Sequence, residues 1–408
     1  MTLPTFSLRK VASTFNNFVK GQAVGGAILI LFTLVALIWA NSPYASLYRS
    51  ISEVPIGFHM GLFKASKPFI YWVNDGLMTL FFLLVGLEVK REICIGELSS
   101  FKKACFPISA AVFGMFFPAV IFLLININHP ENYSGWAIPT ATDIAFALGV
   151  LSLFRNKIPR NIFALLAAIA IADDIGAVII ISIFYTKHID LINLFLSALL
   201  WVLLWGLNFF RIKRLSLYII LGAFLWYFFS KTGIHPSVTG VLLAATVPLG
   251  SHIKWGDEGP SPLQKLENMV NLPVNYIVIP MFILFNAGIA FHSDPVSSEV
   301  GRFFNQLFSP LTMGIFFGLL VGKPFGIFFA AFLFKKLGWT VFSKEVLPKH
   351  ILFMGCLAGI GFTMAIFISD LAFASESFIA PAKIGILLGS LSSVILGCCL
   401  LAVLKNRH

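Results

Sequence analysis

The sequence predicts an all-α polytopic membrane protein, and its composition and patterning give three reasons. Charged residues make up only 12% of the 408 residues, whereas soluble domains carry about 25%. Hydrophobic residues make up 58%. Apolar stretches of about 18 residues or more, long enough for transmembrane helices, recur along the whole chain. No linker or low-complexity tract divides it, so we expect a single transmembrane domain covering residues 1–408.

Twelve membrane spans are predicted from the apolar stretches. They cover approximately residues 22–40, 69–88, 104–125, 134–154, 160–185, 190–210, 215–230, 236–249, 270–291, 307–334, 350–373 and 381–404. The first is longer than the apolar part of a signal peptide, so we interpret it as an uncleaved span. The connection 41–68 contains Pro, Gly and Ser, which are typical of turns or a small hairpin.

The Lys and Arg residues predict that both termini are cytoplasmic. With the N-terminus inside, 21 of the 29 fall in inside segments, seven fall in outside segments, and Lys323 lies within a span. This asymmetry follows the positive-inside rule and requires an even number of spans. The net charge of +11 is therefore a topology signal, and without a basic stripe or module it predicts no nucleic-acid partner. The five cysteines show neither metal spacing nor a disulfide framework.

The second predicted span carries charged residues at both ends. Asp75 lies near its outer end, and we expect it to be a vestibule or folding residue. At the cytoplasmic end, Glu88, Arg91 and Glu92 of "LEVKRE" share one helical face, and Glu267 can join them. This group is either a topology-setting end cap or a charged funnel that collects cations and responds to pH.

The fourth span is interrupted near its middle by Pro139 and the stretch Thr140–Thr142, just before Asp143. Broken backbone at membrane depth is tolerated only beside a cavity or within protein. A carboxylate at this position can neutralise the positive N-termini of half-helices. Thr142 offers a hydroxyl to the freed backbone or to a cation.

The fifth span contains "AIAIADDIGAVIII", in which Asp173 and Asp174 are adjacent. A charged side chain at the centre of a bilayer is costly, so it is by default a functional hypothesis. Neighbours on a helix diverge by about 100°, but both carboxylates can border one cavity. Their repulsion falls if a cation binds between them or if one takes a proton. Binding one then expels the other, which is the minimum chemistry of a cation/proton exchanger.

Lys323, in the tenth span, needs a counter-charge. The sequence leaves Asp173 and Asp174 open as partners, and a lysine that reaches the membrane interface is the alternative. His235, at the start of the short eighth span, is expected to be a satisfied helix-start histidine rather than a sensor. Asp370 lies near the outer edge of the eleventh span.

The eleventh span has a break that matches the fourth, in "CLAGIGFTMAIF" with Gly359, Gly361 and Thr363. One interrupted span in each half of the chain is typical of an inverted-repeat transporter.

Five motifs together carry a close resemblance to the bacterial NhaA sodium/proton antiporters, which are themselves a standard example of that repeat plan. They are "NDGLMTLFFLLVGLEVKRE", "TATDIAFALGV", "IADDIGAV", "GKPFG" and "GIGFTMAIFI". The resemblance extends in order from about residue 16 to residue 400. It implies a fold of twelve spans, of which the fourth and eleventh are discontinuous and cross each other. It also implies electrogenic exchange of Na+ or Li+ for a larger number of protons.

The resemblance also implies roles for individual residues. Asp174 looks like the principal cation ligand, and Asp173 like a proton carrier and the partner of Lys323. Asp143 looks like the charge-compensating residue at the helix crossing, with Thr142 as a candidate ligand beside it. The family's pH-response cluster corresponds to Glu88, Arg91, Glu92 and Glu267.

One departure limits the resemblance. Family members often carry histidines just after the position of Glu267, where this chain has Asn268 and Asn271. The resemblance therefore implies Na+/H+ exchange for this chain, but it does not imply the family's pH set point.

These observations predict an antiporter, not an enzyme, in the bacterial inner membrane. It would exchange cytoplasmic Na+ or Li+ for external H+ by alternating access, without a cofactor, in sodium and pH homeostasis. The length of segment 41–68 and the family, but no motif, favour a homodimer.

Three other classes fit less well. An intramembrane aspartyl protease would need a Gly-x-Gly-Asp signature, but Phe362 stands where the aspartate would be. An organic-anion symporter would need a basic or amide-rich site, whereas three aspartates favour cations. A passive cation channel is disfavoured by Lys323 at the site.

Overall fold

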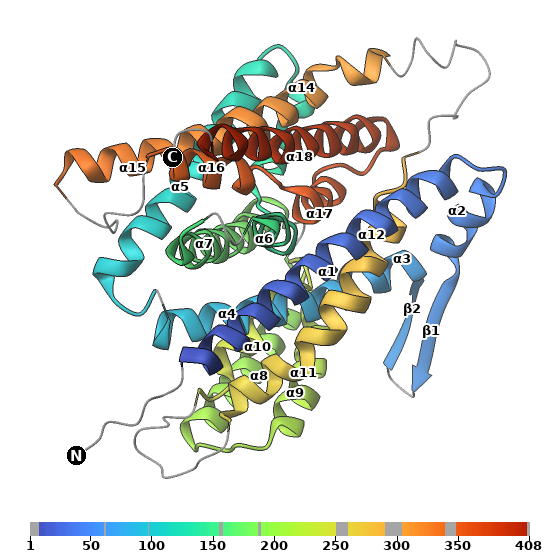
Figure 1. Cartoon of the computed structure of the whole chain (residues 1–408). Coiled ribbons are helices and arrows are strands. Elements are labelled where there is room, and N and C mark those ends of the chain that lie inside the picture. Colours follow the sequence, from blue (N-terminus) through green and yellow to red (C-terminus); the bar gives the residue numbers. More distant parts are fainter. Residues whose placement is uncertain are drawn as a thin grey trace, which may run out of the picture.

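The computed structural model describes residues 8–60, 63–96, 98–154, 158–186, 189–249, 260–289, 304–338 and 348–405, and these are almost entirely helical (Figure 1). The α-helices are α1 (Leu8–Ala40), α2 (Ala45–Glu53), α3 (Phe69–Tyr71), α4 (Met78–Ile95), α5 (Phe101–Ile125), α6 (Ile144–Leu153), α7 (Arg160–Phe184), α8 (Leu191–Phe209), α9 (Leu215–Phe229), α10 (Val238–Thr246), α11 (Pro262–Pro273), α12 (Ile279–Asn286), α14 (Pro310–Phe317), α15 (Lys323–Lys336), α16 (Pro348–Ala358), α17 (Phe362–Ala372) and α18 (Glu376–Lys405).

Short 3-10 and π-helical segments join several of these helices. The 3-10 segments are η2 (Pro130–Gly135) and η3 (Ile138–Thr140), and the π-helical segments are η1 (Trp72–Leu77), η4 (Val274–Val278) and η5 (Gly318–Gly322). Such π-helical turns inside longer helices often occur at functional sites. One of them contains Asp75, and another ends directly before Lys323.

The described residues contain seven helical segments long and apolar enough to cross a membrane, or ten if each of three bent helix pairs is one span. This confirms a helical membrane protein. The difference from the twelve predicted spans falls on α9 and α10, which have only 15 and nine residues. A straight crossing of the bilayer core takes about 20 residues, which both helices lack.

The connection 41–68 contains the small hairpin that its turn residues predicted. Strands β1 (Pro55–Met60) and β2 (Phe63–Pro68) pair antiparallel, with Pro55 opposite Pro68. The hairpin lies at the edge of the helical body (Figure 1). Several loop residues used for the orientation prediction, Arg155, Lys157, Lys187, Lys254, Arg302, Lys344 and Arg407, lie outside the described residues.

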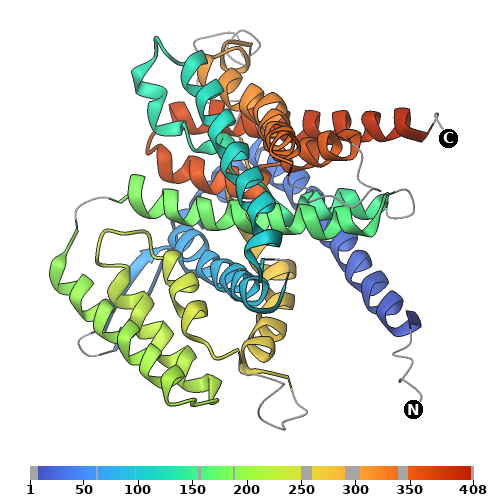
Figure 2. The ribbon, with the colours of Figure 1, turned by 90° about the vertical axis from the view of Figure 1, so that its left-hand side faces the viewer.

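The helices form two groups with α6 and α7 between them (Figures 1 and 2). In one group α4 packs on α10, α8 on α9, and α1 on α12; in the other, α5 and α16 pack on α15, and α18 packs on α14 and α16. The central α7 contacts α5 on one side and α4 on the other, while α6 packs on α1. The adjacent aspartates of α7 therefore lie between the two groups.

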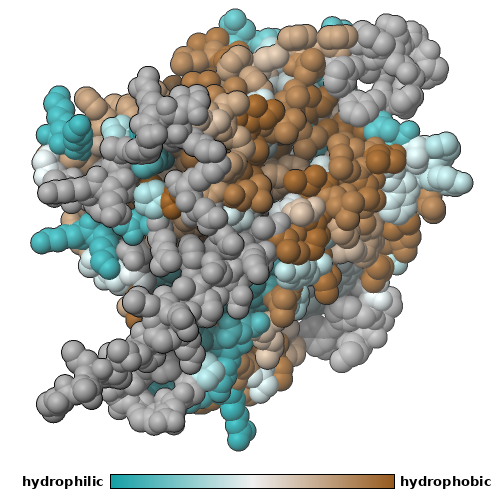
Figure 3. Space-filling view, in the orientation of Figure 1, coloured by the Kyte–Doolittle hydropathy of each residue, from teal (hydrophilic) through white to brown (hydrophobic). Residues whose placement is uncertain are grey.

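Broad apolar surfaces remain exposed on the outside of the molecule (Figure 3). On α8, for example, Leu191, Ile192 and Phe195 are each at least 69% exposed. Soluble monomers rarely expose contiguous apolar patches beyond a few hundred Å². These faces therefore suit contact with lipid tails.

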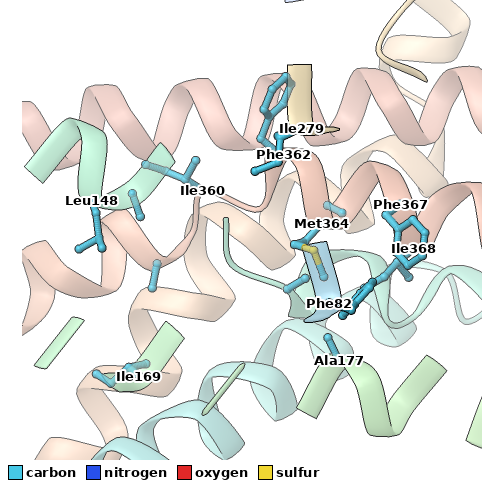
Figure 4. Close-up of a cluster of buried hydrophobic side chains, with 14 of the residues drawn as sticks. Phe82, Leu148, Ile169, Ala177, Ile279, Ile360, Phe362, Met364, Phe367 and Ile368 are labelled. Carbon is cyan, nitrogen blue, oxygen red and sulfur yellow. The ribbon is translucent and has the colours of Figure 1, made fainter. Parts of the chain in front are cut away.

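Inside, buried side chains form a core that surrounds the break between α16 and α17. Figure 4 shows Ile360 in this break, Phe362 at the start of α17, and Phe82 of α4 beside Phe367 and Ile368 of α17. The apolar core thus holds the broken segment on both sides.

Glycines allow the closest helix contacts. A Cβ on Gly240 of α10 would lie 2.3 Å from the carbonyl oxygen of Thr79, and one on Gly86 of α4 would lie 2.7 Å from the Cβ of Ala244. Small residues at helix interfaces allow backbones to approach closely, which is how helices associate in membranes.

We expect Gly240→Ala to destabilise the protein by about 1–3 kcal/mol, because the added methyl group cannot fit without moving α10 away from α4. The measurement is the midpoint of thermal unfolding in detergent. The matched control is Gly206→Ala on α8, where no heavy atom lies within 4 Å of the new Cβ, and where alanine favours the helix. Equal midpoints for both variants would contradict the close α4–α10 contact.

Candidate functional site

The two predicted helix breaks meet in the structure. The helix axes bend by 47° between η3 and α6 and by 46° between α16 and α17. The backbone N–H of Asp143 donates to the carbonyl oxygen of Ile360 at 2.6 Å. A Cβ on Gly361 would lie 2.9 Å from the Ala141 carbonyl oxygen, and one on Gly359 would lie 2.5 Å from that of Leu319. Both glycines therefore permit a backbone contact that a side chain would block.

The carboxylate of Asp143 caps the N-termini of both half-helices that start at this crossing. Its Oδ1 accepts from the backbone N–H of Phe146 in α6 at 3.0 Å. Its Oδ2 accepts from the backbone N–H of Thr363 at 3.0 Å and from the Thr363 hydroxyl at 2.5 Å. Each helix N-terminus carries about half a positive charge, so one buried carboxylate balances both. The expectation that Asp143 faces half-helix N-termini is met by this geometry.

Lys323 is fully buried and forms an ion pair with Asp173 through Oδ2. Its exposed fraction of 0% excludes the alternative in which the ammonium reaches the membrane interface. Of the two partners that the sequence left open, the geometry therefore selects Asp173. Breaking such a buried pair on one side leaves an uncompensated charge, which typically costs about 3–5 kcal/mol.

The hydroxyl of Thr142 lies between this ion pair and the end of α16. Its Oγ1 is 2.6 Å from Oδ2 of Asp173 and 2.8 Å from the carbonyl oxygen of Ala358, the last residue of α16. A hydroxyl has one proton to donate. It can donate to an ionised Asp173, or it can accept from a protonated Asp173 and donate to Ala358. The hydrogen bonds of Thr142 are thus linked to the protonation of Asp173.

Asp174 is 1% exposed, and its Oδ1 has no hydrogen-bond partner among the described residues. The Oδ1 of Asp173 likewise has no hydrogen-bond partner among the described residues. The charges that act on Asp174 include those of Asp173, Asp143, Glu88 and Lys323. Two buried carboxylate oxygens without partners lie on adjacent residues, which makes them available to a proton or a cation.

Carboxylate, hydroxyl and backbone carbonyl oxygens are the ligands that hard cations prefer. The site supplies all three kinds through Asp173, Asp174, Thr142 and Ala358. Among the described residues, no group of three His, Cys, Asp or Glu side chains is arranged to hold a metal ion. The oxygens of Asp173, Asp174, Thr142 and Ala358 suit a small hard cation, and the same two carboxylates can instead take protons.

The charged group at the end of α4 forms around Arg91. Its Nη1 lies 2.5 Å from Oε1 of Glu267 in α11, and its Nη2 lies 3.4 Å from Oε1 of Glu92. The charges of Arg91 and Glu267 also act on Glu88, whose charge acts on Asp174. The structure thus places Glu267 in the group, as expected.

Three polar contacts were not predicted as contacts. Lys90 donates to the carbonyl oxygens of Ala245 and Val247, each at 2.6 Å, and so caps the end of α10. The sequence marked Lys90 only as a basic residue beside a predicted loop. Its partners depend on the packing of α4 against α10.

The other two join an acidic side chain to a basic one at the opposite end of the molecule. Asp75 Oδ1 lies 3.1 Å from Nε2 of His235, and Asp370 Oδ1 lies 3.3 Å from Nζ of Lys383. Each acid was singled out from the sequence. The pairing of Asp75 with His235 depends on tertiary packing, because the two residues lie far apart in the chain.

The chain matches the family model described as "Na+/H+ antiporter 1" over residues 16–401. It is 40% identical over 399 residues to "Na(+)/H(+) antiporter NhaA 1" of Clostridium beijerinckii, which covers 98% of this chain and 97% of the relative. It is 39% identical over 398 residues to "Na(+)/H(+) antiporter NhaA" of Glaesserella parasuis, covering 96% and 97%. The protein of that name from Photorhabdus laumondii is 40% identical over 399 residues, covering 97% and 100%.

These matches extend over nearly the full length of both chains, and the motifs fall in the same site that the geometry defines. The chain is thus a multi-pass membrane transporter that works with Na+ and H+ and without a cofactor, and it belongs to the NhaA-type Na+/H+ antiporter family.

Proposed function

We propose that the exchange takes place at Asp173 and Asp174. The observation that carries this proposal is the buried ion pair of Lys323 with Asp173, adjacent to an Asp174 oxygen that has no partner among the described residues. Two adjacent carboxylates repel when both are ionised, so they hold either protons or a cation. Competition between the two kinds of ion at one site is what an antiporter requires.

In this proposal Na+ binds Asp174 together with the free oxygen of Asp173, and Li+ can take the same oxygen ligands. The cation displaces a proton from Asp174, and a second proton leaves from the pair of Asp173 and Lys323. Thr142 follows the change by moving its hydrogen bond between Asp173 and Ala358. Two protons then exchange for one cation, so the exchange moves net charge.

The alternating exposure of this site is proposed to use twelve spans with both termini in the cytoplasm. Counting α9, α10 and each broken pair as spans gives this number, and the Lys and Arg distribution supports the orientation. The crossing of the two broken spans supports inverted repeats. The exposed hairpin, β1 and β2, offers an edge through which two copies can pair.

The group of Glu88, Arg91, Glu92 and Glu267 is proposed to attract cations and set the pH response. It lies at the end of α4 that this orientation places in the cytoplasm. The charge of Glu88 acts on Asp174, so the group is coupled electrostatically to the site. Because Arg91 is 37% exposed, its ion pairs contribute at most about 1 kcal/mol to stability. Their role is therefore better sought in the pH dependence of transport.

Asp174→Asn is expected to abolish the Na+-dependent dissipation of ΔpH in everted vesicles, because an amide cannot exchange a proton for a cation. Thermal stability should not fall, since the variant removes a buried charge without a partner. Asp190→Asn is the matched control, because Asp190 is exposed and caps α8, a role that asparagine also fills. Antiport by Asp174→Asn at the rate of the control would exclude the proposed cation site.

The pair of Lys323 and Asp173 can be tested by a double-mutant cycle on thermal stability. Lys323→Ala should destabilise the wild type by about 3–5 kcal/mol, because Asp173 is left charged and buried. In the Asp173→Asn background the same substitution should cost clearly less. If the two losses are equal, the ion pair does not exist in the membrane.

Glu267→Gln is expected to retain the maximal antiport rate but to shift its pH dependence to lower pH. Removing this negative charge lets the remaining acids of the group lose their protons more easily. The measurement is the rate of Na+-dependent ΔpH dissipation across pH 6–9. Glu53→Gln, at the exposed end of α2, should leave the profile unchanged, and identical profiles for the two variants would refute the role in pH response.

A further inference from the structure

The end of α17 remote from its break carries an ion pair that the exchange described above does not use. Asp370 of α17 and Lys383 of α18 lie 3.3 Å apart, with side chains 16% and 11% exposed. The pair therefore lies at the edge of the described structure, although most of both side chains is covered. We call Asp370 and Lys383 the distal pair.

The distal pair lies on the helical face that also serves the buried site. Thr363, Phe367 and Asp370 are spaced at i, i+4 and i+7, which places them in one row along α17. Thr363 binds the carboxylate of Asp143. Asp370 follows about 10 Å further along the axis, at a rise of about 1.5 Å per residue. A single rigid element thus joins the two acidic positions.

Between Thr363 and Asp370 in this row, the ring of Phe367 packs in a cluster of aromatic side chains. Its ring centroid lies 5.5 Å from that of Phe82, 6.0 Å from that of Phe282 and 5.3 Å from that of His235. Figure 4 shows Phe82 and Phe367 side by side. These partners come from the other helix group, so the cluster joins the two groups, and we call it the aromatic seal. Along α17, Asp370 therefore lies beyond the aromatic seal, on the side away from the break next to Asp143.

Only one oxygen of the Asp370 carboxylate contacts Lys383. Oδ1 faces Lys383, whereas Oδ2 is buried and has no hydrogen-bond partner among the described residues. The nearby charges that act on Asp370 are those of Lys383 and Glu376, and the Tyr48 hydroxyl of α2 feels the charge of Asp370. A buried carboxylate oxygen without a partner is unfavourable, and a bound cation would supply the missing contact.

We propose that Asp370 is a second, transient site for the transported monovalent cation, between the aromatic seal and the water at that end of the molecule. Lys383 occupies the carboxylate while no cation is bound, and a cation at Oδ2 displaces it. The inference rests on the proposed exchange at Asp173 and Asp174, which the cation reaches when α17 moves and the seal opens.

The test measures the dependence of ΔpH change on Na+ added to one face at a time, in everted and in right-side-out membrane vesicles. Asp370→Asn should raise the KM for Na+ about tenfold at the face where the distal pair lies, as for the loss of one charge-assisted contact. The KM at the opposite face should stay within about twofold of wild type. Glu131→Gln is the matched control, because it removes an exposed carboxylate outside the distal pair and should leave both values unchanged.

A purely structural role for the ion pair predicts a different result. The double variant Asp370→Asn with Lys383→Gln leaves no buried unpaired charge, so it should regain thermal stability even if the single variant folds poorly. If it also regains the wild-type KM at the distal face, the pair is structural and the inference is overturned. An equal effect of Asp370→Asn at both faces, or none at either, would overturn it as well. A wild-type protein that does not respond to Na+ at either face would instead overturn the exchange itself.

Discussion

The double cap formed by Asp143 is the interaction on which the rest of the site depends. In a bilayer every backbone polar group must find a partner within the protein, so a helix can break only where something replaces its lost hydrogen bonds. Asp143 does this for α6 and for α17 at once. Without that carboxylate, two half-helix N-termini would face each other with unsatisfied N–H groups and like partial charges.

The cap also helps to explain why Asp174 is the carboxylate of this site without a charged partner among the described residues. Two half-charges of the helix N-termini balance Asp143, and Lys323 balances Asp173. Asp174 then has no ion-pair partner among the described residues. In the exchange proposed above, a proton neutralises Asp174 while the pair of Asp173 and Lys323 is intact, and a cation takes its place once that proton and the proton of the pair have left.

Movement of these charges requires the two helix groups to shift without losing their packing. Close glycine contacts such as that of Gly240 with Thr79 hold α10 to α4 within one group, whereas the contact around Phe367 joins α17 to the other group through side chains alone. Side-chain contacts rearrange more easily than backbone contacts in a close-packed interior. In the exchange proposed above, the broken α17 is therefore the expected moving part, since it starts beside Asp143 and ends at the distal pair.

The sequence by itself determined the membrane-spanning class, the two breaks, and every acid of the site, because intramembrane charges and broken helices are too costly to be accidental. Only the tertiary structure decided how these groups pair. It chose Asp173 over Asp174 for Lys323, joined Asp75 to His235, and gave Asp143 two helices to cap. Such choices depend on ångström distances between helices far apart in the chain, and hydrophobic periodicity, which marks buried faces, does not encode which faces meet.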